Sequence, residues 1–276
     1  MSNKNFPLIS VVMNCYNGEK YLREAIDSVY MQSHKNWEII FWDNASSDSS
    51  EEIANSYDKR LKYFKSRKNT VLGEARVQAV KKANGNFIAF LDVDDIWLEK
   101  KLEQQLSIFL KKEGEIGFVY GRSEVIYSDS LKNNFIIGEG FTLPDGDIFL
   151  ELAKENFVVF SSLMVDREKF YKCGGFPSHF LNSTDYWVLL NMAQKYPCGS
   201  VQELCCKYRI HDANLSKSQR VISAQESIEI LNKILPNDSL LNLMQYQYAN
   251  LAIMHIKEFN LLQFFVTIFK YKCFDL

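Results

Sequence analysis

Short apolar runs alternate with amphipathic segments over the first 120 residues of the chain. Runs of this kind occupy residues 9–13, 37–42, 61–65, 87–91 and 116–120. Most of them are rich in Val, Ile, Phe or Leu, as are strands that are covered on both faces. The pattern therefore predicts five buried strands.

The segments between these runs carry apolar side chains at the spacing of one helix face. They are residues 18–32, a segment that opens within 44–50 and continues to about 57, residues 73–83, and residues 97–112. Ser47 or Asp48 is suited to begin the second helix as its N-cap. Asn84 and Gly85 are suited to end the third helix with a left-handed residue.

Strands that alternate with crossover helices form a mostly parallel central sheet flanked by helices, which is an α/β fold. Ligands of such sheets bind beyond the carboxyl ends of the strands. Polar residues gather at three of these ends, at positions 14–17, 43–48 and 92–95. We expect the three segments to converge on one binding site.

The rest of the chain is less regular. Residues 121–218 mix short strands with a helix near 185–195, and we expect them to complete a domain of residues 1–218. Residues 219–276 are rich in Leu, Ile, Phe and Tyr and are predicted to form a helical C-terminal extension. The aromatic side chains of residues 259–274 are expected to pack on the domain. The alternative is peripheral contact of this segment with a membrane surface.

Composition narrows the class of protein. Of 276 residues, 47% are hydrophobic and the formal net charge is −2, so no basic field indicates a nucleic-acid partner. Six cysteines occur without a CxxC pair, which favours reduced thiols. The first ten residues lack the apolar core of a signal peptide, and no run of ~18 uncharged apolar residues predicts a membrane span. We therefore expect a cytoplasmic protein.

Three aspartates, Asp92, Asp94 and Asp95, follow the fourth predicted strand within four residues. Crowded carboxylates repel one another unless a cation or hydrogen bonds compensate them. Mg²⁺ or Mn²⁺ suits such a cluster, because each binds one or two carboxylates together with phosphate oxygens and water. Asp95 is also placed to cap the helix that is predicted to begin near residue 97.

Other carboxylate motifs fit less well. An EF-hand loop from Asp92 would need glycine at its sixth position, where Trp97 stands. A phosphatase with Asp92 as its nucleophile stays open, although its Asp-x-Asp motif usually lies on the first strand. A two-aspartate phospho-receiver leaves Asp43 and Arg76 without a role. Because no GxGxxG or GxxxxGKS/T motif occurs, dinucleotide and P-loop sites are excluded.

Taken together, several segments resemble the family 2 glycosyltransferases of the GT-A fold. In order they are residues 9–17 (ISVVMNCYN), 37–40 (WEII), 43–48 (DNASSD), 73–76 (GEAR), 90–97 (FLDVDDIW), 173–176 (CGGF), 184–187 (TDYW) and 208–211 (YRIH). The match is dense over residues 7–120 and thinner beyond them. Asn14 and Cys15 depart from the usual Pro-Thr of the family, and Thr184 departs from its usual Glu.

The resemblance implies a Rossmann-like GT-A fold, with a nucleotide-sugar-binding half in residues 1–120 and an acceptor-binding half in residues 121–218. It also implies an inverting glycosyltransferase that uses Mn²⁺ or Mg²⁺ and, by default, a UDP-sugar donor. The acceptor would be a glycan, a lipid-linked sugar or a protein, as in the synthesis of bacterial surface polysaccharides and glycoconjugates. A site at the inner face of the cell membrane would suit a lipid-linked acceptor. A relative that binds carbohydrate or nucleotide without turnover is the alternative.

The resemblance assigns donor contacts to four residues outside the acidic cluster. Tyr16 would lie beside the base, where Asn14 alters the contacts, and Asp43 would accept a hydrogen bond from the imide N–H of the base. Core packing is the alternative for Tyr16, and an Asx turn or helix cap is the alternative for Asp43. Arg76 is predicted in the first turn of its helix, where the dipole disfavours a cation, so a ligand role is favoured.

The metal and the acceptor define the remaining roles. Asp92 would contact the ribose, Val93 would belong to the same donor site, and Asp94 would bind the metal. His211 would add a nitrogen ligand, which favours Mn²⁺ over Mg²⁺; the alternative is a loop histidine bonded to the backbone. Asp185 is the candidate base for the acceptor hydroxyl, with the N-cap of its helix as the alternative role.

Overall fold

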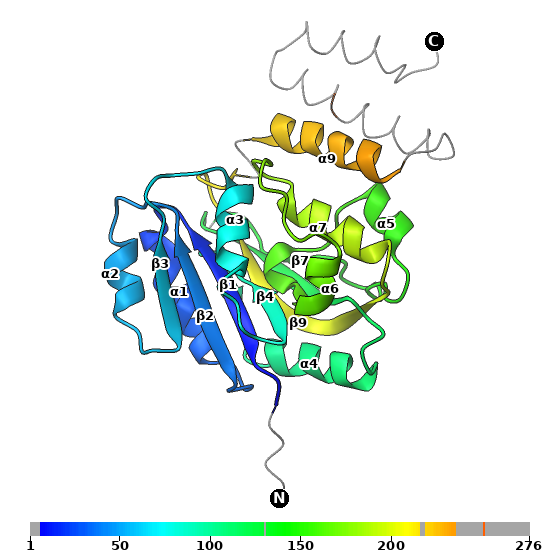
Figure 1. The fold of residues 1–276 in the computed structure, drawn as a ribbon, viewed down its shortest axis with the longest axis horizontal. Helices are drawn as coiled ribbons and strands as arrows, with labels where there is room; N and C mark the ends of the chain where they lie inside the picture. Colours follow the sequence, from blue (N-terminus) through cyan, green and yellow to red (C-terminus); the bar gives the residue numbers. More distant parts are fainter. Residues whose placement is uncertain (1–5, 130, 216–218, 236–250, 252–276) are drawn as a thin grey trace, which may run out of the picture.

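A nine-stranded sheet forms the centre of the computed structural model, which describes residues 6–129, 131–215, 219–235 and 251. The strand order is β3 (Leu61–Lys65), β2 (Trp37–Asp43), β1 (Ile9–Cys15), β4 (Phe87–Phe90), β8 (Met164–Asp166), β6 (Phe118–Tyr127), β9 (Cys198–Ile210) and β5 (Ile96–Trp97), with β7 (Phe135–Ile136) paired to β6. Figure 1 shows this sheet between layers of helices. The α/β prediction is confirmed.

Strands from the first half of the chain pair in parallel. β1 lies between β2 and β4 and is parallel to both, and β2 is parallel to β3. The second half adds antiparallel pairs through β8, β5 and β7, whereas β6 and β9 are parallel. The register places Asn14 opposite Trp42 and Cys15 opposite Asp43, so β1 and β2 end at the same level. The loops that follow these two strands therefore start side by side.

Helices pack on both faces of the sheet. One layer contains α1 (Glu19–Tyr30), α2 (Ser50–Asn55) and α4 (Lys101–Lys111), and the other contains α3 (Leu72–Val80), α5 (Phe149–Lys154), α6 (Arg167–Lys172), α7 (Thr184–Ala193) and α9 (Arg220–Ile234). Side chains of a strand point alternately to its two faces. Val11 and Met13 accordingly enter the core under the first layer, and Val12 enters the core under the second.

The helix predicted to begin at residue 97 begins later. Ile96 and Trp97 form the short strand β5, which pairs with β9, and α4 starts at Lys101. The helical spacing of apolar residues in α4 extends toward the N-terminus as far as Trp97, although Trp97 belongs to strand β5. Periodicity alone could not detect this pairing, because the partner strand lies more than 100 residues away.

Two predicted helix caps are also wrong. The second helix has Ser49 as its N-cap, not Ser47 or Asp48. The third helix ends at Val80, and Gly85 lacks the left-handed conformation that was predicted for it. A Cβ atom on Gly85 would lie 2.6 Å from the backbone nitrogen of Ser10. Gly85 is therefore suited to the close approach of its loop to β1.

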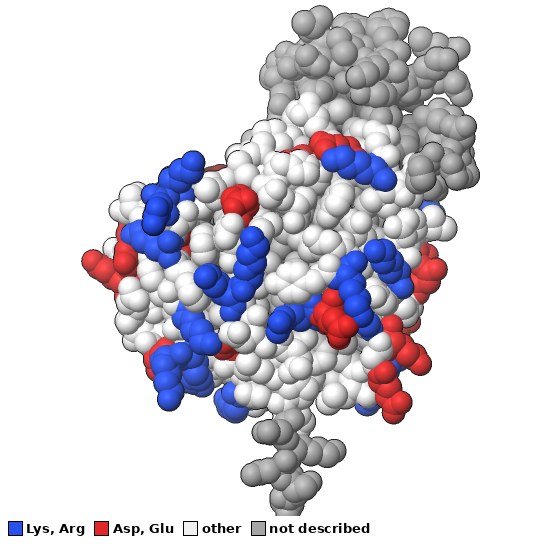
Figure 2. Space-filling model, viewed as in Figure 1, with Lys and Arg blue, Asp and Glu red and all other residues white. Residues whose placement is uncertain are grey.

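The second half of the chain extends the same sheet. Helix α9 packs Ile230 and Leu231 into the core beside α7. The domain boundary predicted after residue 218 stays a prediction. Residues 236–250 and 252–276, including the aromatic segment 259–274, lie outside the described residues. In the part of the chain that is described, no helix is long and apolar enough to cross a membrane. Figure 2 shows basic and acidic side chains interspersed on one face, in keeping with the small net charge.

Candidate active site

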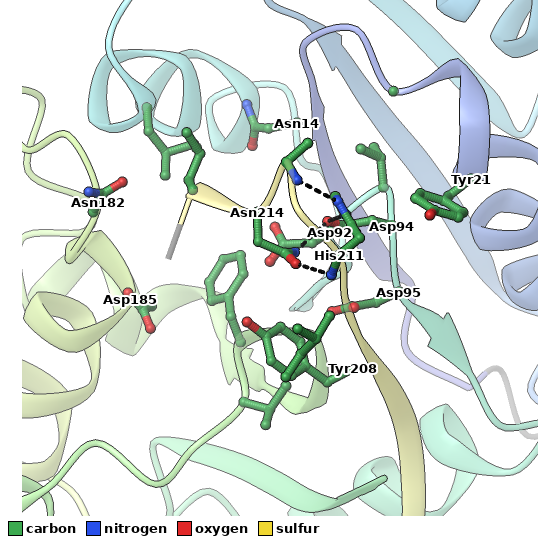
Figure 3. Close-up of a pocket in the computed structure, with 18 of the residues that line it drawn as sticks. Asn14, Tyr21, Asp92, Asp94, Asp95, Asn182, Asp185, Tyr208, His211 and Asn214 are labelled. Carbon is green, nitrogen blue, oxygen red and sulfur yellow. Dashed lines mark hydrogen bonds and ion pairs between the residues drawn. The ribbon is translucent and has the colours of Figure 1, made fainter. Parts of the chain in front are cut away.

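A pocket of about 1240 Å³ opens beyond the carboxyl ends of β1 and β4. The loops after these strands, the start of α7, the residues after β9 and part of α9 form its walls. The predicted site residues in its lining are Asn14, Tyr16, Arg76, Asp92, Val93, Asp94, Asp185 and His211. Figure 3 shows side chains from these separate elements arranged around the pocket. Of the predicted site residues, Asp43 does not line it.

The loop after β1 forms one wall and is bonded to the loop after β2. The backbone N–H of Asn17 donates to Ser46 Oγ at 2.9 Å, and Asn17 Oδ1 accepts from the backbone of Ser47 at 2.9 Å. Asn17 and Ala45 have φ values of 54° and 66°, which non-glycine residues seldom adopt. The two loops thus hold each other in a strained conformation, as is common at binding sites.

Two residues of this wall, Asn14 and Tyr16, have groups that the other described residues do not engage. The side chain of Tyr16 is 54% exposed at the pocket, so it does not belong to the core. Asn14 Nδ2 is buried and has no hydrogen-bond partner among the described residues. A buried amide donor of this kind in a pocket wall is a candidate for a ligand contact.

Asp43 shapes the neighbouring loop instead of facing the pocket. Its carboxylate is fully buried and accepts from the backbone N–H of Ser46 at 2.7 Å and from Tyr63 Oη at 2.6 Å. Burial, together with this bond to Asp43, raises the pKa of the Tyr63 hydroxyl. Each carboxylate oxygen of Asp43 keeps a second lone pair, and its predicted contact with a nucleobase stays a prediction.

Asp95 is a buried member of the acidic loop, which comprises residues 92–95 after β4, and its predicted role as a helix cap is wrong. Its side chain is 1% exposed and accepts from Ser161 Oγ at 2.5 Å and from the backbone N–H of Arg209 at 2.8 Å. Burial, and then the charges of Asp94 and Asp92, raise the pKa of Asp95 well above its usual value. Asp95 thereby joins the loop after β4 to β9.

Asp94 reaches the end of β9 from the same loop. Its Oδ2 atom lies 3.0 Å from His211 Nε2 and 3.2 Å from Asn214 Nδ2. The backbone N–H of Ala213 donates to His211 Nδ1 at 3.2 Å, so in this arrangement Nε2 carries the proton that faces Asp94. The His211 ring also packs beside that of Tyr21, with centroids 5.1 Å apart.

A carboxylate and an imidazole nitrogen in contact could hold a divalent cation, which would replace the proton on Nε2. Among residues 6–129, 131–215, 219–235 and 251, no group of three or more His, Cys, Asp or Glu is suited to a metal. The protein would therefore supply a small share of the ligands. This fits Mg²⁺ and Mn²⁺ sites that are completed by substrate phosphates and water.

Arg76 lies in the second turn of α3, not in the first turn as predicted, and its side chain is buried in the pocket wall. It is the fifth residue of α3, is 5% exposed, and its guanidinium lies 3.8 Å from the centroid of the Phe160 ring. Nη1 donates to Thr184 Oγ1 at 2.5 Å, and Nη2 donates to Asp92 Oδ1 at 3.3 Å. Arg76 thus links the acidic loop to the start of α7, where Thr184 stands in place of the usual Glu.

Asp92 lies between positive and negative neighbours. Burial raises its pKa to about 6, Arg76 opposes this shift, and the charges of Asp94 and Asp185 add to it. Several carboxylates therefore act on one another within this pocket, and they would repel the diphosphate of a nucleotide unless a cation or protons compensated their charge.

Asp185 faces the pocket from the first turn of α7 and is not the cap of that helix. The N-cap residue is Ser183, and Asp185 Oδ2 accepts from Asn156 Nδ2 at 3.1 Å. Figure 3 shows Asp185 on the side of the pocket opposite Asp94, His211 and Tyr21. The alternative role as an N-cap is wrong.

Three supporting residues were not among the predicted site residues. Arg209 Nε donates to the backbone oxygen of Asp94 at 2.9 Å, and its Nη2 donates to Glu24 at 2.6 Å. Its guanidinium also lies 4.5 Å from the centroid of the Tyr21 ring. Arg209 belongs to the YRIH segment, so its position beside His211 was a usable signal. The role of Glu24 depends on a tertiary contact, and Glu24 had no local signal.

Comparison with known proteins adds a family match. The family model described as glycosyl transferase family 2 matches residues 10–175. The chain is 32% identical over 215 residues to the Escherichia coli UDP-Glc:alpha-D-GlcNAc-diphosphoundecaprenol beta-1,3-glucosyltransferase WfgD, covering 77% of this chain and 81% of WfgD. It is 31% identical over 166 residues to TuaG of Bacillus subtilis, a glycosyltransferase assigned to teichuronic acid biosynthesis, covering 59% of this chain and 64% of TuaG.

Solved structures agree on the fold. S. aureus TarS 1-349 in complex with UDP-GlcNAc aligns with a TM-score of 0.64 and 16% identity over 95% of this chain and 72% of that protein. The mannosyltransferase PcManGT from Pyrobaculum calidifontis, in complex with GDP-Man and Mn²⁺, aligns with a TM-score of 0.62 and 13% identity over 92% of this chain and 76% of that protein.

Proposed function

The chain belongs to glycosyl transferase family 2, and on that premise we propose that it is an inverting enzyme that transfers a sugar from a UDP-sugar to a hydroxyl group. The observation that carries this proposal is the placement of Asp94 and His211 on one side of the pocket and of Asp185 on the other. Direct displacement needs stabilisation of the leaving diphosphate on one face of the sugar and a base on the opposite face.

Asp94 and His211 would hold a Mn²⁺ or Mg²⁺ ion against the diphosphate of the donor. Once bound there, the ion would neutralise the negative charge that gathers on the departing diphosphate. Asn14 offers its unpaired amide N–H to a donor oxygen, and Tyr16 offers an exposed ring to the base. Asp92 would contact the ribose, while Val93 lines the same side of the pocket.

Asp185 would act as the general base. One of its oxygens accepts from Asn156, and among the described residues the other has no protein donor, so it can accept the proton of an acceptor hydroxyl. A single displacement inverts the anomeric configuration and leaves UDP as the second product. The hydroxyl proton moves to Asp185 as the new glycosidic bond forms.

The acceptor would be a sugar carried by a lipid diphosphate, used at the inner face of the cell membrane in surface polysaccharide synthesis. Two relatives support this choice: WfgD is named for a GlcNAc-diphosphoundecaprenol acceptor, and TuaG for teichuronic acid biosynthesis. TarS, which shares the fold of this chain, was solved in complex with UDP-GlcNAc, and this is compatible with a UDP-sugar donor.

A thermal-shift screen of nucleotide sugars with Mn²⁺, followed by measurement of UDP release, tests the proposal. A donor at 100 times its Kd should stabilise the protein by about 2.7 kcal/mol. Binding without UDP release under any condition would support the non-catalytic alternative. Phosphate release from small phosphoesters without a nucleotide would support the phosphatase alternative, in which Asp92 is the nucleophile.

A further inference from the structure

Glu226 of α9 binds the loop that leads into α7. Its carboxylate accepts from three successive backbone N–H groups, those of Leu181 at 2.6 Å, Asn182 at 3.0 Å and Ser183 at 2.7 Å. Glu226 itself is 8% exposed. Hydrogen bonds to a buried carboxylate are among the stronger ones in proteins, so this contact fixes the loop firmly.

The three N–H groups end at the residue where α7 begins. Ser183 is the N-cap of α7, but its own side chain makes no capping bond and instead donates to the backbone oxygen of Ser223 at 3.1 Å. An anion near a helix N-terminus is favoured by the dipole. α9 therefore supplies the negative group that α7 lacks, two residues before Asp185.

The same side of α9 reaches the pocket. Ser223 and Ser227 belong to the lining, together with Asn182 and Asp185. Both serine hydroxyls donate to backbone oxygens one turn earlier on their own helix, at 3.2 Å and 2.8 Å. Their oxygens keep lone pairs that can accept hydrogen bonds from the hydroxyl groups of a sugar.

We propose that α9 completes the acceptor subsite of this enzyme. Glu226 is a positioning residue that sets the place of Asp185 through the loop before α7, and Ser223 and Ser227 bind the hydroxyl groups of the acceptor sugar. This inference rests on the proposed function and extends the catalytic unit to α9, beyond the residues matched by the family model.

The test compares Glu226→Gln with Glu229→Gln in the full chain. Both substitutions remove a carboxylate from α9, but Glu229 is half exposed and pairs with Lys233. Three quantities are measured. They are the Kd of UDP-glucose with Mn²⁺, the kcat of UDP release, and the rate of amide hydrogen exchange at residues 181–186. The acceptor in the kcat measurement is 4-nitrophenyl N-acetyl-α-D-glucosaminide, or water if the enzyme does not use that glycoside.

Glu226→Gln should lower kcat about tenfold or more and speed exchange at residues 181–183, with the Kd of UDP-glucose unchanged within about twofold. Glu229→Gln should match the wild type in all three measurements. If the wild type binds no nucleotide sugar and releases no UDP, the proposed function fails. If the wild type is active and Glu226→Gln has the same kcat, the inference is wrong even if exchange is faster.

Ser227→Val is the second variant and decides the matter if Glu226→Gln does not fold. It removes a hydroxyl and adds bulk at the pocket wall without touching the loop before α7. We expect the KM of the aryl glycoside to rise at least about threefold, with unchanged affinity for UDP-glucose and an unchanged rate of donor hydrolysis by water. A wild-type KM for the glycoside would overturn the assignment of α9 to the acceptor subsite.

Discussion

Asp94 Oδ2 and His211 Nε2 lie 3.0 Å apart, although 117 positions separate the two residues in the sequence. Arg209 maintains this contact from the preceding strand, because its side chain donates to the backbone oxygen of Asp94. Glu24 and Tyr21 of α1 in turn hold Arg209. The pair that is suited to a metal is therefore positioned by three separate parts of the fold.

Asp94→Asn should weaken the binding of UDP-glucose in Mn²⁺ while leaving thermal stability nearly unchanged. The carboxylate is the main charged group offered to the cation, and without a cation the other carboxylates repel the diphosphate. Calorimetry in Mn²⁺ and in EDTA measures the effect: the wild type should bind much more tightly in Mn²⁺, and the variant should lose most of that difference. Equal affinities of the wild type in both buffers would contradict the metal assignment.

Asp95→Ala, unlike Asp94→Asn, should reduce the stability of the protein. It leaves the Ser161 hydroxyl and the Arg209 backbone N–H without their acceptor in a buried site. Each such group costs about 1–3 kcal/mol. Denaturant unfolding measures this loss, and a variant as stable as the wild type would show that water or a neighbouring group replaces Asp95.

Asp185→Asn should lower the rate of transfer by about 10²–10⁴ while the affinity for the donor stays nearly unchanged, because general-base catalysis contributes about that much. Asp166→Asn is the matched control, since Asp166 is a genuine N-cap whose side chain accepts from the backbone of Lys169 at 2.9 Å. Asn caps a helix about as well as Asp, so the control should keep full activity. Retained transfer in Asp185→Asn would mean that another group is the base.

Gly73→Ala should reduce both stability and donor-dependent activity. A Cβ atom at this position would lie 2.2 Å from the backbone oxygen of Pro177 and 2.9 Å from that of Phe180, so α3 must move and carry Arg76 with it. Overpacking of this kind costs about 1–3 kcal/mol. Gly114→Ala is the control: its φ of 82° is strained for alanine, but apart from its two chain neighbours no atom of the described residues lies within 4 Å of the added Cβ. It should lose stability and keep its activity per folded molecule, as measured by UDP release.

The burial of Lys101 leads us to expect that the free energy of unfolding rises with pH. Lys101 is fully buried, donates to Gln105 at 2.7 Å and lies 4.0 Å from the centroid of a Trp97 ring, and burial lowers its pKa to about 8. The unfolded chain, with an ordinary lysine pKa near 10.4, binds more protons between about pH 8 and 10.4. The free energy of unfolding should therefore rise over this interval by up to about 3 kcal/mol from this group.

Lys101→Met isolates that contribution. The difference in unfolding free energy between the variant and the wild type should be most favourable to the variant near pH 7 and should shrink toward pH 10. Ionisation of tyrosines and of cysteines far from Lys101 affects both proteins alike and cancels in this difference. Cys205 and Cys206 do interact with Lys101, but burial raises the pKa of both thiols in the folded protein, which moves their folded-state ionisation toward higher pH. If this difference does not change with pH, the pKa of Lys101 is not lowered in the folded state.

The sequence predicted the sheet and the edge that carries the pocket. The strand at residues 61–65 was located at its observed bounds, and the loops after β1 and β4 were expected at the site where they lie. These predictions depend on local apolar runs and on the rule that parallel strands end at one edge. Both remain visible in a single sequence.

What the sequence could not predict depends on contacts between distant segments. Asp95 had the local pattern of a helix cap, yet Ser161 and Arg209 bury it inside the protein. Asp43 had the polarity of a ligand group; its carboxylate also accepts from Tyr63 on the next strand, and its contact with a base stays a prediction. Nothing near Asp95 or Asp43 in the sequence indicates these tertiary partners.

The path of the chain through the site has a consequence for its synthesis on the ribosome. Residues 6–97, which contain strands β1 to β5 and the loop after β4, emerge long before residues 184–234. Until then Asp95 lacks the backbone of Arg209, and strand β5 lacks β9 as its partner. Domains generally fold as units. The pocket of a nascent chain therefore stays incomplete until β9 and α7 have joined the first half of the sheet.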